Sequence, residues 1–279
     1  MQRIFLIGLL LISCQLHAQT FSTTTSNTLT DSPYELNWAL DGPWLGVGLG
    51  LTGYGFKLIQ DKDRMSEADL ATLDKNDIMG MDRWAAGNYD EDLDRLSYIP
   101  FYAAFASPFL LLLNENERNH AGQLAVIYLE TLSTTGALFT LSAGLIDKSR
   151  PYVYNTDLPL EERTNSSAQR SFFGGHVAAT GAATFFLAKV FHDFNPGHWA
   201  RPYVWTAAAL VPAWVGYMRI ESGHHFLSDT LIGYAVGMAS GILIPELHKK
   251  RDRAIKVSSS MGIDRMGNEY QGLSLKYQF

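Results

Sequence analysis

The second half of the chain alternates long apolar segments with short polar ones. Glycine, alanine, serine and threonine are frequent within the apolar segments, which suits close helix packing in lipid or in a soluble bundle. Several segments are close to the length that a helix needs to cross a bilayer. The pattern predicts an all-α fold, a helical bundle of five or six helices that spans a membrane. The apolar runs are residues 97–113, 122–146, 176–191, 203–218 and 227–243.

The residues ahead of these runs are more polar. Residues 20–32 are rich in serine and threonine and indicate a linker. Residues 43–59 are apolar but crowded with glycines, so we place them at the membrane surface rather than across it. Residues 61–96 are densely charged, which is typical of a solvated face. We therefore predict a linker and a charged extracytoplasmic helical region at residues 19–96, followed by a helical core at residues 97–247.

The first residues have the pattern of a secretory signal. Arg3 precedes an apolar segment at residues 4–12, and we predict a signal peptide at residues 1–18. The only cysteine, Cys14, lies inside this segment, so cleavage after it would leave a chain without an internal disulfide. Residues 11–14 also resemble a lipoprotein cleavage box, in which the cysteine would be lipidated. Both alternatives predict a bacterial cell-envelope protein.

A basic cluster at residues 248–253 follows the last apolar run. Positive clusters favour the cytoplasmic side of a membrane, so counting back through five crossings places residue 97 outside. The same count places the polar motifs described below on the periplasmic face. The basic C-terminal tail, residues 248–279, alternates polar and apolar positions in places and allows a short hairpin at residues 257–279.

Composition adds one constraint on the ligand. The chain is 47% hydrophobic and 18% charged, with a formal net charge of −6 and a pI near 5.7. Nucleic acid is not expected as a partner because no global basic field is present. Any anionic ligand must be bound by a local cluster of arginines.

Three short polar segments, the polar islands, stand at the ends of predicted helices: residues 148–151, 173–176 and 219–229. The topology places all three on the same face of the membrane. Two of them carry arginines, Arg150 and Arg219, whose planar guanidinium groups match phosphate oxygens. The third contains Gly174 and Gly175 just before an apolar run, where backbone N–H groups can approach an anion at the start of a helix. Together they predict a phosphate site that needs no metal and no cofactor.

Histidines in the same islands predict the chemistry. His225 and Asp229 are four residues apart, so on one helix the carboxylate could hold an imidazole N–H while the other ring nitrogen attacks phosphorus. His176 would protonate the leaving oxygen as general acid. His224 fills no such role and is interpreted as structural. Glu130 lies inside an apolar run and has no partner that the sequence identifies.

At these residues the sequence resembles the type 2 phosphatidic acid phosphatase superfamily, which also contains bacterial acid phosphatases and vanadium haloperoxidases. Its first motif is lysine, six residues, then Arg-Pro; its second is Pro-Ser-Gly-His. Its third is Ser-Arg, five residues, histidine, three residues, aspartate. The matching residues are Arg150-Pro151 in the first motif, Gly175-His176 in the second, and Arg219, His225 and Asp229 in the third.

Three positions depart from the family pattern. The motif lysine falls on Ala143, and the two motif serines fall on Gly174 and Met218. We expect Lys148 to reach into the site from the loop and Gly174 to donate its backbone N–H instead of a hydroxyl. Losing a charged phosphate ligand costs about 1.5 to 3 kcal/mol, so we expect lowered activity or a different substrate preference.

The resemblance implies a phosphatase that forms a phosphohistidine at His225. If the site opens at the bilayer surface, the substrate is a phosphorylated lipid, either a monoester or a pyrophosphate. One alternative is a soluble or lipid-anchored periplasmic acid phosphatase that acts on small phosphate esters. A second is a catalytically impaired relative that only binds phosphorylated lipid. Haloperoxidase chemistry is disfavoured because the family's vanadate-binding members use the lysine that Ala143 replaces.

Overall fold

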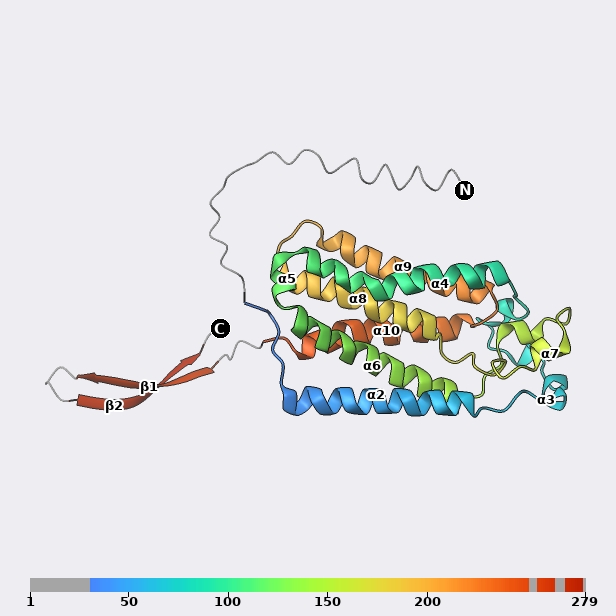
Figure 1. Cartoon of the computed structure of the whole chain (residues 1–279), viewed down its shortest axis with the longest axis horizontal. Coiled ribbons are helices and arrows are strands. Elements are labelled where there is room, and N and C mark those ends of the chain that lie inside the picture. The colour runs from blue at the N-terminus through green and yellow to red at the C-terminus, as the bar shows by residue number, and fades with distance from the viewer. Residues whose placement is uncertain (1–30, 251–254, 264–268, 278–279) are drawn as a thin grey trace, which may run out of the picture. The chain divides into compact units, whose positions relative to one another are not determined.

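The computed structural model describes residues 31–250, 255–263 and 269–277. Its long helices lie side by side, and the all-α prediction is confirmed (Figure 1). The long helices are α2 (Trp38–Gln60), α4 (Glu91–Ala106), α6 (Ala121–Leu145), α8 (Gly175–Phe194), α9 (Arg201–Glu221) and α10 (Leu227–Leu247). The short helices are α3 (Glu67–Ala71), α5 (Glu115–Asn119), α7 (Leu160–Arg163), η1 (Lys75–Asp77), η2 (Arg83–Ala85), η3 (Ser107–Leu113) and η4 (Pro151–Tyr154).

Helix α8 is the centre of the bundle and packs against α4, α6, α9 and α10. Most of its side chains are buried, as expected for a helix that is apolar on all sides. Glycines let α10 approach it closely: a Cβ at Gly237 would lie 2.2 Å from the Ala178 carbonyl oxygen, and one at Gly241 would lie 2.7 Å from that of Ala182. Larger residues at these two positions would push α10 away from the core.

Helix α2 runs parallel to α6 over much of its length. A Cβ at Gly48 would lie 2.7 Å from Ser133 Oγ, and one at Gly55 would lie 2.3 Å from Thr140 Oγ1. The contacts advance in the same direction along both helices, and small residues on both permit them. The prediction that residues 43–59 lie on the membrane surface is therefore wrong. This segment is an integral helix of the bundle.

The start of α2 and the end of α10 meet at one end of the bundle. The Glu35 N–H donates to the His248 carbonyl oxygen (2.8 Å), and the Lys250 N–H donates to that of Pro33 (2.8 Å). This pairing differs from the predicted arrangement, which placed the N-terminal region outside and the basic cluster inside. The difference arises because α2 adds one more passage along the bundle.

Three helical segments in the described part of the chain are long and apolar enough to cross a membrane: Glu91–Leu113, Ala121–Leu145 and Leu227–Leu247. They match three of the five predicted apolar runs. The other two runs lie in α8 and α9, whose ends carry charged residues such as Lys189 and Arg219.

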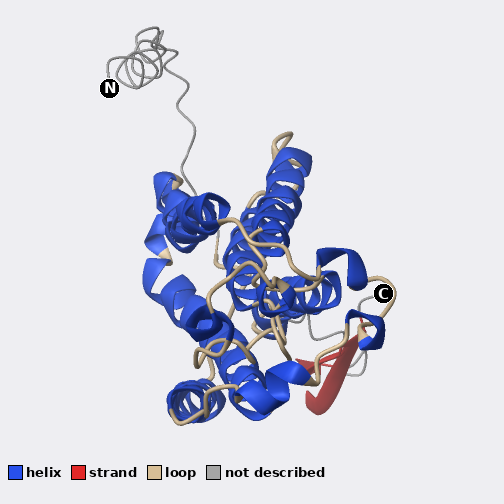
Figure 2. Ribbon diagram, turned by 90° about the vertical axis from the view of Figure 1, so that its right-hand side faces the viewer, coloured by secondary structure: helices blue, strands red, loops and turns tan. Residues whose placement is uncertain are grey.

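The C-terminal residues, for which the sequence allows a hairpin, contain strands β1 (Ile255–Ile263) and β2 (Glu269–Tyr277), drawn red in Figure 2. They pair antiparallel, with Ile255 opposite Tyr277 and Ile263 opposite Glu269. The predicted signal peptide and Cys14 lie outside the described residues.

Candidate active site

The three polar islands meet at the end of the bundle away from the α2–α10 pairing. Arg150 precedes η4, Gly174 precedes α8, Arg219 lies in the last turn of α9, and Asp229 lies in the first turn of α10. The N-terminal turns of α4 complete this end, because Asp94 binds Arg219. The convergence of the islands agrees with the predicted topology of the core.

Of the two motif arginines, Arg219 is buried and Arg150 is half-buried. Arg219 is 2% exposed and donates to Asp94 and to Ser97 Oγ (3.3 Å). Arg150 donates from Nε to the Arg170 carbonyl oxygen (3.4 Å). Burial, together with the charges of Arg219 and Arg170, lowers the Arg150 pKa to about 10. Arg150 is still cationic at neutral pH, so an anion between the arginines would relieve their repulsion.

Backbone donors at the start of α8 provide a second anion-binding element. The N–H groups of Gly175, His176 and Val177 have no acceptor among the described residues, as expected for the first turn of a helix. The Gly174 N–H, in contrast, donates to the Asp229 carbonyl oxygen (3.0 Å). The prediction that Gly174 supplies a phosphate donor is therefore wrong, because the close approach of α10 occupies its N–H. The available donors are the next three.

His225 is held in the tautomer that a nucleophile requires. Its Nδ1 lies 2.6 Å from the Ser171 carbonyl oxygen. A carbonyl only accepts hydrogen bonds, so Nδ1 carries the proton and Nε2 keeps its lone pair. Burial and the charges of Arg150 and Arg219 hold the His225 pKa well below its ordinary value. The imidazole is therefore neutral over the physiological pH range.

The predicted hydrogen bond between Asp229 and His225 is not formed. Asp229 instead accepts from Ser171 Oγ (2.6 Å), the Phe226 N–H (3.1 Å) and Lys148 Nζ (2.7 Å). The reason is that α10 begins after His225, so the four-residue spacing does not place the two side chains on one helical face. Ser171 links the two side chains instead, because its hydroxyl donates to Asp229 and its carbonyl oxygen accepts from His225 Nδ1.

Lys148 is the counter-ion of buried carboxylates rather than a phosphate ligand. Its Nζ lies 2.7 Å from Asp229 Oδ1 and 3.5 Å from Asp82 Oδ2, and it donates to Ser228 Oγ (3.0 Å). The prediction that Lys148 replaces the missing motif lysine is therefore not supported. Asp82 also accepts from the Ser228 N–H (2.8 Å), which ties the charged region before α4 to the start of α10.

Replacing Lys148 with methionine should destabilise the fold. The change leaves two carboxylates, Asp229 at 0% and Asp82 at 2% side-chain exposure, without their cation. Breaking a buried pair in this way costs about 2 to 3 kcal/mol in the free energy of unfolding after allowance for the partial exposure of Lys148. Chemical unfolding of the purified parent and variant measures this loss in the free energy of unfolding. The matched control is Lys57→Met, whose partner Asp61 is 60% exposed, and it should change little. Equal stability of the two variants would contradict this assignment.

His176 is the second residue of α8, and its ring packs against two aromatic rings of α4. The ring centroids lie 4.9 Å from Tyr98 and 4.5 Å from Phe101. Its Nε2 is buried without a hydrogen-bond partner among the described residues. This nitrogen is within the reach of a substrate oxygen only as a neutral group, because burial and the charges of Arg219 and Arg150 lower the His176 pKa to about 3. The general-acid hypothesis therefore requires that a bound phosphate anion stabilise the protonated ring.

His224, interpreted from the sequence as structural, borders the site. Its Nδ1 lies 3.1 Å from Ser222 Oγ, and its Nε2 lies 3.6 Å from Asp94 Oδ1. Burial, with the charges of Arg219 and Arg150, lowers the His224 pKa to about 2.

The pH dependence of the free energy of unfolding should reveal the lowered pKa of His224. The folded state excludes the proton that unfolded His224 binds below its ordinary pKa near 6.5, so stability falls as pH drops from 6.5 toward the folded pKa. Between pH 7 and 5 the parent should lose about 2 kcal/mol more than His224→Gln in the free energy of unfolding. Parallel pH profiles for parent and variant would show that His224 is protonated alike in both states.

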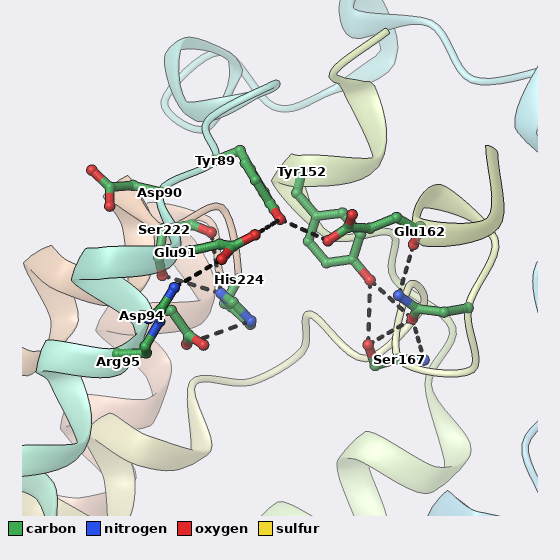
Figure 3. Close-up of a pocket in the computed structure, with 11 residues that line it drawn as sticks. Tyr89, Asp90, Glu91, Asp94, Arg95, Tyr152, Glu162, Ser167, Ser222 and His224 are labelled. Carbon is green, nitrogen blue, oxygen red and sulfur yellow. Dashed lines mark hydrogen bonds and ion pairs between the residues drawn. The ribbon is translucent and has the colours of Figure 1, made fainter. Parts of the chain in front are cut away.

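A polar cavity of about 260 Å³ opens beside His224 (Figure 3). Its wall comes from the start of α4, the loop around η4 and α7, and the α9–α10 turn. Tyr89 Oη lies 2.8 Å from Glu162 Oε1 and 2.9 Å from Glu91 Oε1, and its single proton can be donated to either carboxylate, so the tyrosine joins two sides of the opening. The cavity lining includes the carboxylates of Asp90, Glu91, Asp94 and Glu162 but neither motif arginine, so the cavity borders the candidate site rather than containing it.

Sequence reasoning missed several residues of the site. Asp94 and Asp82 lie in the charged region that was interpreted as a solvated face, yet Asp82 is 1% exposed and Asp94 binds Arg219. Their positions before the first apolar run were the only available signal. Ser97 and Ser171 carried none, because their roles depend on contacts with distant residues.

Comparison with known proteins agrees with this geometry. Residues 124–253 match the family model described as the PAP2 superfamily, which confirms the resemblance seen in the motifs. The matched segment includes both motif arginines, His176, His225 and Asp229. The match supports phosphatase-type activity in general. No curated protein and no solved structure matches the chain.

Proposed function

We propose, from the membership of residues 124–253 in the PAP2 superfamily, that this protein hydrolyses a phosphate monoester or pyrophosphate through a phosphohistidine on His225. One observation carries the proposal. The neutral His225 ring has Nδ1 bonded to a carbonyl, which leaves the Nε2 lone pair available near the positive charges of Arg150 and Arg219.

The proposed reaction has two steps. In the first, His225 Nε2 bonds to phosphorus as the bond to the leaving oxygen breaks, and His176 gives that oxygen a proton. In the second, His176 takes a proton from water, whose oxygen attacks phosphorus and breaks the N–P bond. Phosphate leaves, and both histidines return to their starting states. Asp229 positions His225 through Ser171.

Charge stabilisation in both steps comes from three elements. Arg150 and Arg219 bind the equatorial oxygens, and the free N–H groups at the start of α8 add backbone donors. Lys148 does not replace the motif lysine that is lost at Ala143, since it is engaged with carboxylates. We therefore expect slower turnover than a complete motif would give.

A lipid substrate follows from the surface of the bundle. Large apolar side chains are exposed along five of its long helices, α2, α4, α6, α9 and α10, over an area that lipid would cover better than water. They include Trp44, Val47, Leu51 and Tyr54 of α2, Ile99 and Tyr102 of α4, Leu210 and Trp214 of α9, and Leu231 and Leu243 of α10. The substrate phosphate would then enter at the bundle end, near the lipid headgroups.

Basic residues at one end of the bundle imply an orientation in the membrane. Lys249 and Lys250 lie at the end opposite the candidate active site, so their placement on the cytoplasmic side turns that site toward the periplasm. Pro33 pairs with Lys250, so it lies on the cytoplasmic side too. This orientation is incompatible with cleavage of a signal peptide in the periplasm.

That incompatibility favours a second candidate. In a soluble or lipid-anchored periplasmic acid phosphatase, cleavage of the signal peptide is compatible with the pairing of Pro33 and Lys250. The whole bundle would then lie on one side of the membrane. Extraction separates the two proposals. A membrane-spanning protein stays in membranes through alkaline carbonate and needs detergent, whereas a soluble one leaves with carbonate. A lipid-anchored one leaves only after loss of its anchor.

Phosphate release tests the activity itself. Purified protein is given a lipid monophosphate, a lipid pyrophosphate and a water-soluble aryl phosphate, with His225→Asn measuring contaminating phosphatase. We expect release by the parent, with the lipids preferred. Preference for the aryl phosphate would favour the soluble enzyme. A folded parent that binds these compounds without releasing phosphate would contradict catalysis and favour the binding relative.

A further inference from the structure

We propose that Asp41, Glu130 and His248 form a binding site for a divalent transition-metal ion, distinct from the candidate active site. The three residues come from separate parts of the bundle: the first turn of α2, the middle of α6 and the residue after α10. They lie at the end where Glu35 pairs with His248, opposite the arginines. Nothing in the phosphatase chemistry requires them.

The spacing of the side-chain atoms suits a shared ion. His248 Nε2 lies 2.9 Å from Glu130 Oε2 and 3.5 Å from Asp41 Oδ1, and one ligand atom from each residue lies within 4.8 Å of the others. Two ligands at about 2.1 Å from a tetrahedral ion are about 3.4 Å apart. Small side-chain rotations would bring all three atoms to that separation.

The histidine has the orientation of a metal ligand. His248 Nδ1 lies 2.8 Å from the Ile244 carbonyl oxygen, so Nδ1 carries a proton and Nε2 faces the carboxylates. Metal-binding histidines are commonly fixed by such a bond from the other ring nitrogen. Asp41 is fixed similarly, because its Oδ2 accepts from the Asn37 N–H (2.6 Å) and leaves Oδ1 directed at the cluster.

Unsatisfied polar atoms provide the independent observation. Glu130 is 1% exposed, and its Oε1 has no hydrogen-bond partner among the described residues. The buried His248 Nε2 likewise makes no hydrogen bond of acceptable geometry. Buried polar atoms are normally satisfied, and unsatisfied atoms on two side chains that lie against each other indicate a ligand between those side chains.

Charge favours a cation over a simple ion pair. With both carboxylates ionised, a protonated His248 would leave the buried cluster with a net charge of −1, which is costly. A divalent ion bound by a neutral imidazole and two carboxylates leaves no net charge. The site also explains why Glu130 occurs inside an apolar run.

The ligand set selects the kind of ion. Calcium and magnesium prefer sites made of oxygen atoms alone, whereas imidazole with carboxylates suits zinc and its first-row neighbours. Three protein ligands leave a position for water. Zinc is the appropriate probe.

The test uses the full chain without an affinity tag, stripped with a chelator and titrated with zinc against a chromophoric competitor. We expect one zinc per chain and a higher unfolding temperature. Glu130→Gln and His248→Gln should each weaken zinc binding at least about tenfold and lose most of the thermal shift. The matched control is Glu117→Gln, because Glu117 is also 0% exposed with one unsatisfied oxygen but lies outside the cluster.

Two results would overturn the proposal. One is a parent that takes up no zinc. The other is zinc binding that survives both substitutions unchanged, which would leave the three residues as an ion pair that joins α2, α6 and α10. If Glu130→Gln does not fold, His248→Gln decides alone, since its side chain lies at the bundle end and is 10% exposed. Calcium binding without zinc binding would contradict the proposed class of ion. None of these readouts depends on phosphatase activity.

Discussion

Replacing His225 with asparagine is expected to lower phosphate release by about four orders of magnitude or more, the scale seen when an enzyme loses its nucleophile. Asparagine is the sharpest substitution here, because its amide N–H can keep the bond that His225 Nδ1 makes to the Ser171 carbonyl oxygen. The position that Nε2 occupies is then empty. The variant therefore removes the lone pair while preserving the local hydrogen bonding.

The expected loss must be separated from unfolding. His225→Asn should unfold close to the parent temperature, and inorganic phosphate should still raise that temperature, since Arg150 and Arg219 are intact. Turnover is measured with the substrate that the parent prefers. A variant that keeps more than a few per cent of parental activity would show that His225 is not the nucleophile.

Replacing Arg150 with methionine is expected to lower kcat/KM by about a thousandfold, the upper part of the range for losing one preorganised donor to a transition state. Arg150 is the less engaged of the two motif arginines. Among the described residues its side chain makes a hydrogen bond only from Nε to the Arg170 carbonyl oxygen, whereas Arg219 is already bound to Asp94. Arg150 therefore has more of its guanidinium available to phosphate.

The same substitution should make the protein more stable. The charges of Arg219 and Arg170 and the burial of Arg150 all act against its cation, so methionine removes an unfavourable buried charge. Arg150→Met is thus expected to raise the unfolding temperature in phosphate-free buffer and to lose the stabilisation by phosphate. Arg150→Lys keeps the positive charge but lacks the planar guanidinium that binds two phosphate oxygens at once, so it should recover little activity. Lower stability together with parental activity would show that Arg150 is structural.

The sequence predicted the fold and much of the site because the relevant signals are local. Apolar runs separated by polar islands indicate helices whose ends meet. The spacing of Arg219, His225 and Asp229 is set within one short segment. The convergence of these residues with Arg150 then follows from alternating helix directions.

The errors concern contacts that the spacing of residues along the chain does not determine. The four-residue spacing suggested a His225–Asp229 bond, but where α10 begins depends on Asp229 accepting the Phe226 N–H. Lys148 was assigned to phosphate because the carboxylate of Asp82, far away in the sequence, could not be foreseen as its partner. Glu130 remained unexplained for the same reason, since Asp41 and His248 approach it from opposite ends of the chain.

The most direct test of the central claim is to trap the intermediate. Protein and radiolabelled substrate are mixed at the preferred pH, quenched in alkali within the first turnover, and digested to locate the label. We expect label on the peptide that contains His225, stable in alkali and lost in acid as expected for an N–P bond, and absent in His225→Asn. Turnover by the parent without any such label, or label on another residue, would contradict a phosphohistidine at His225.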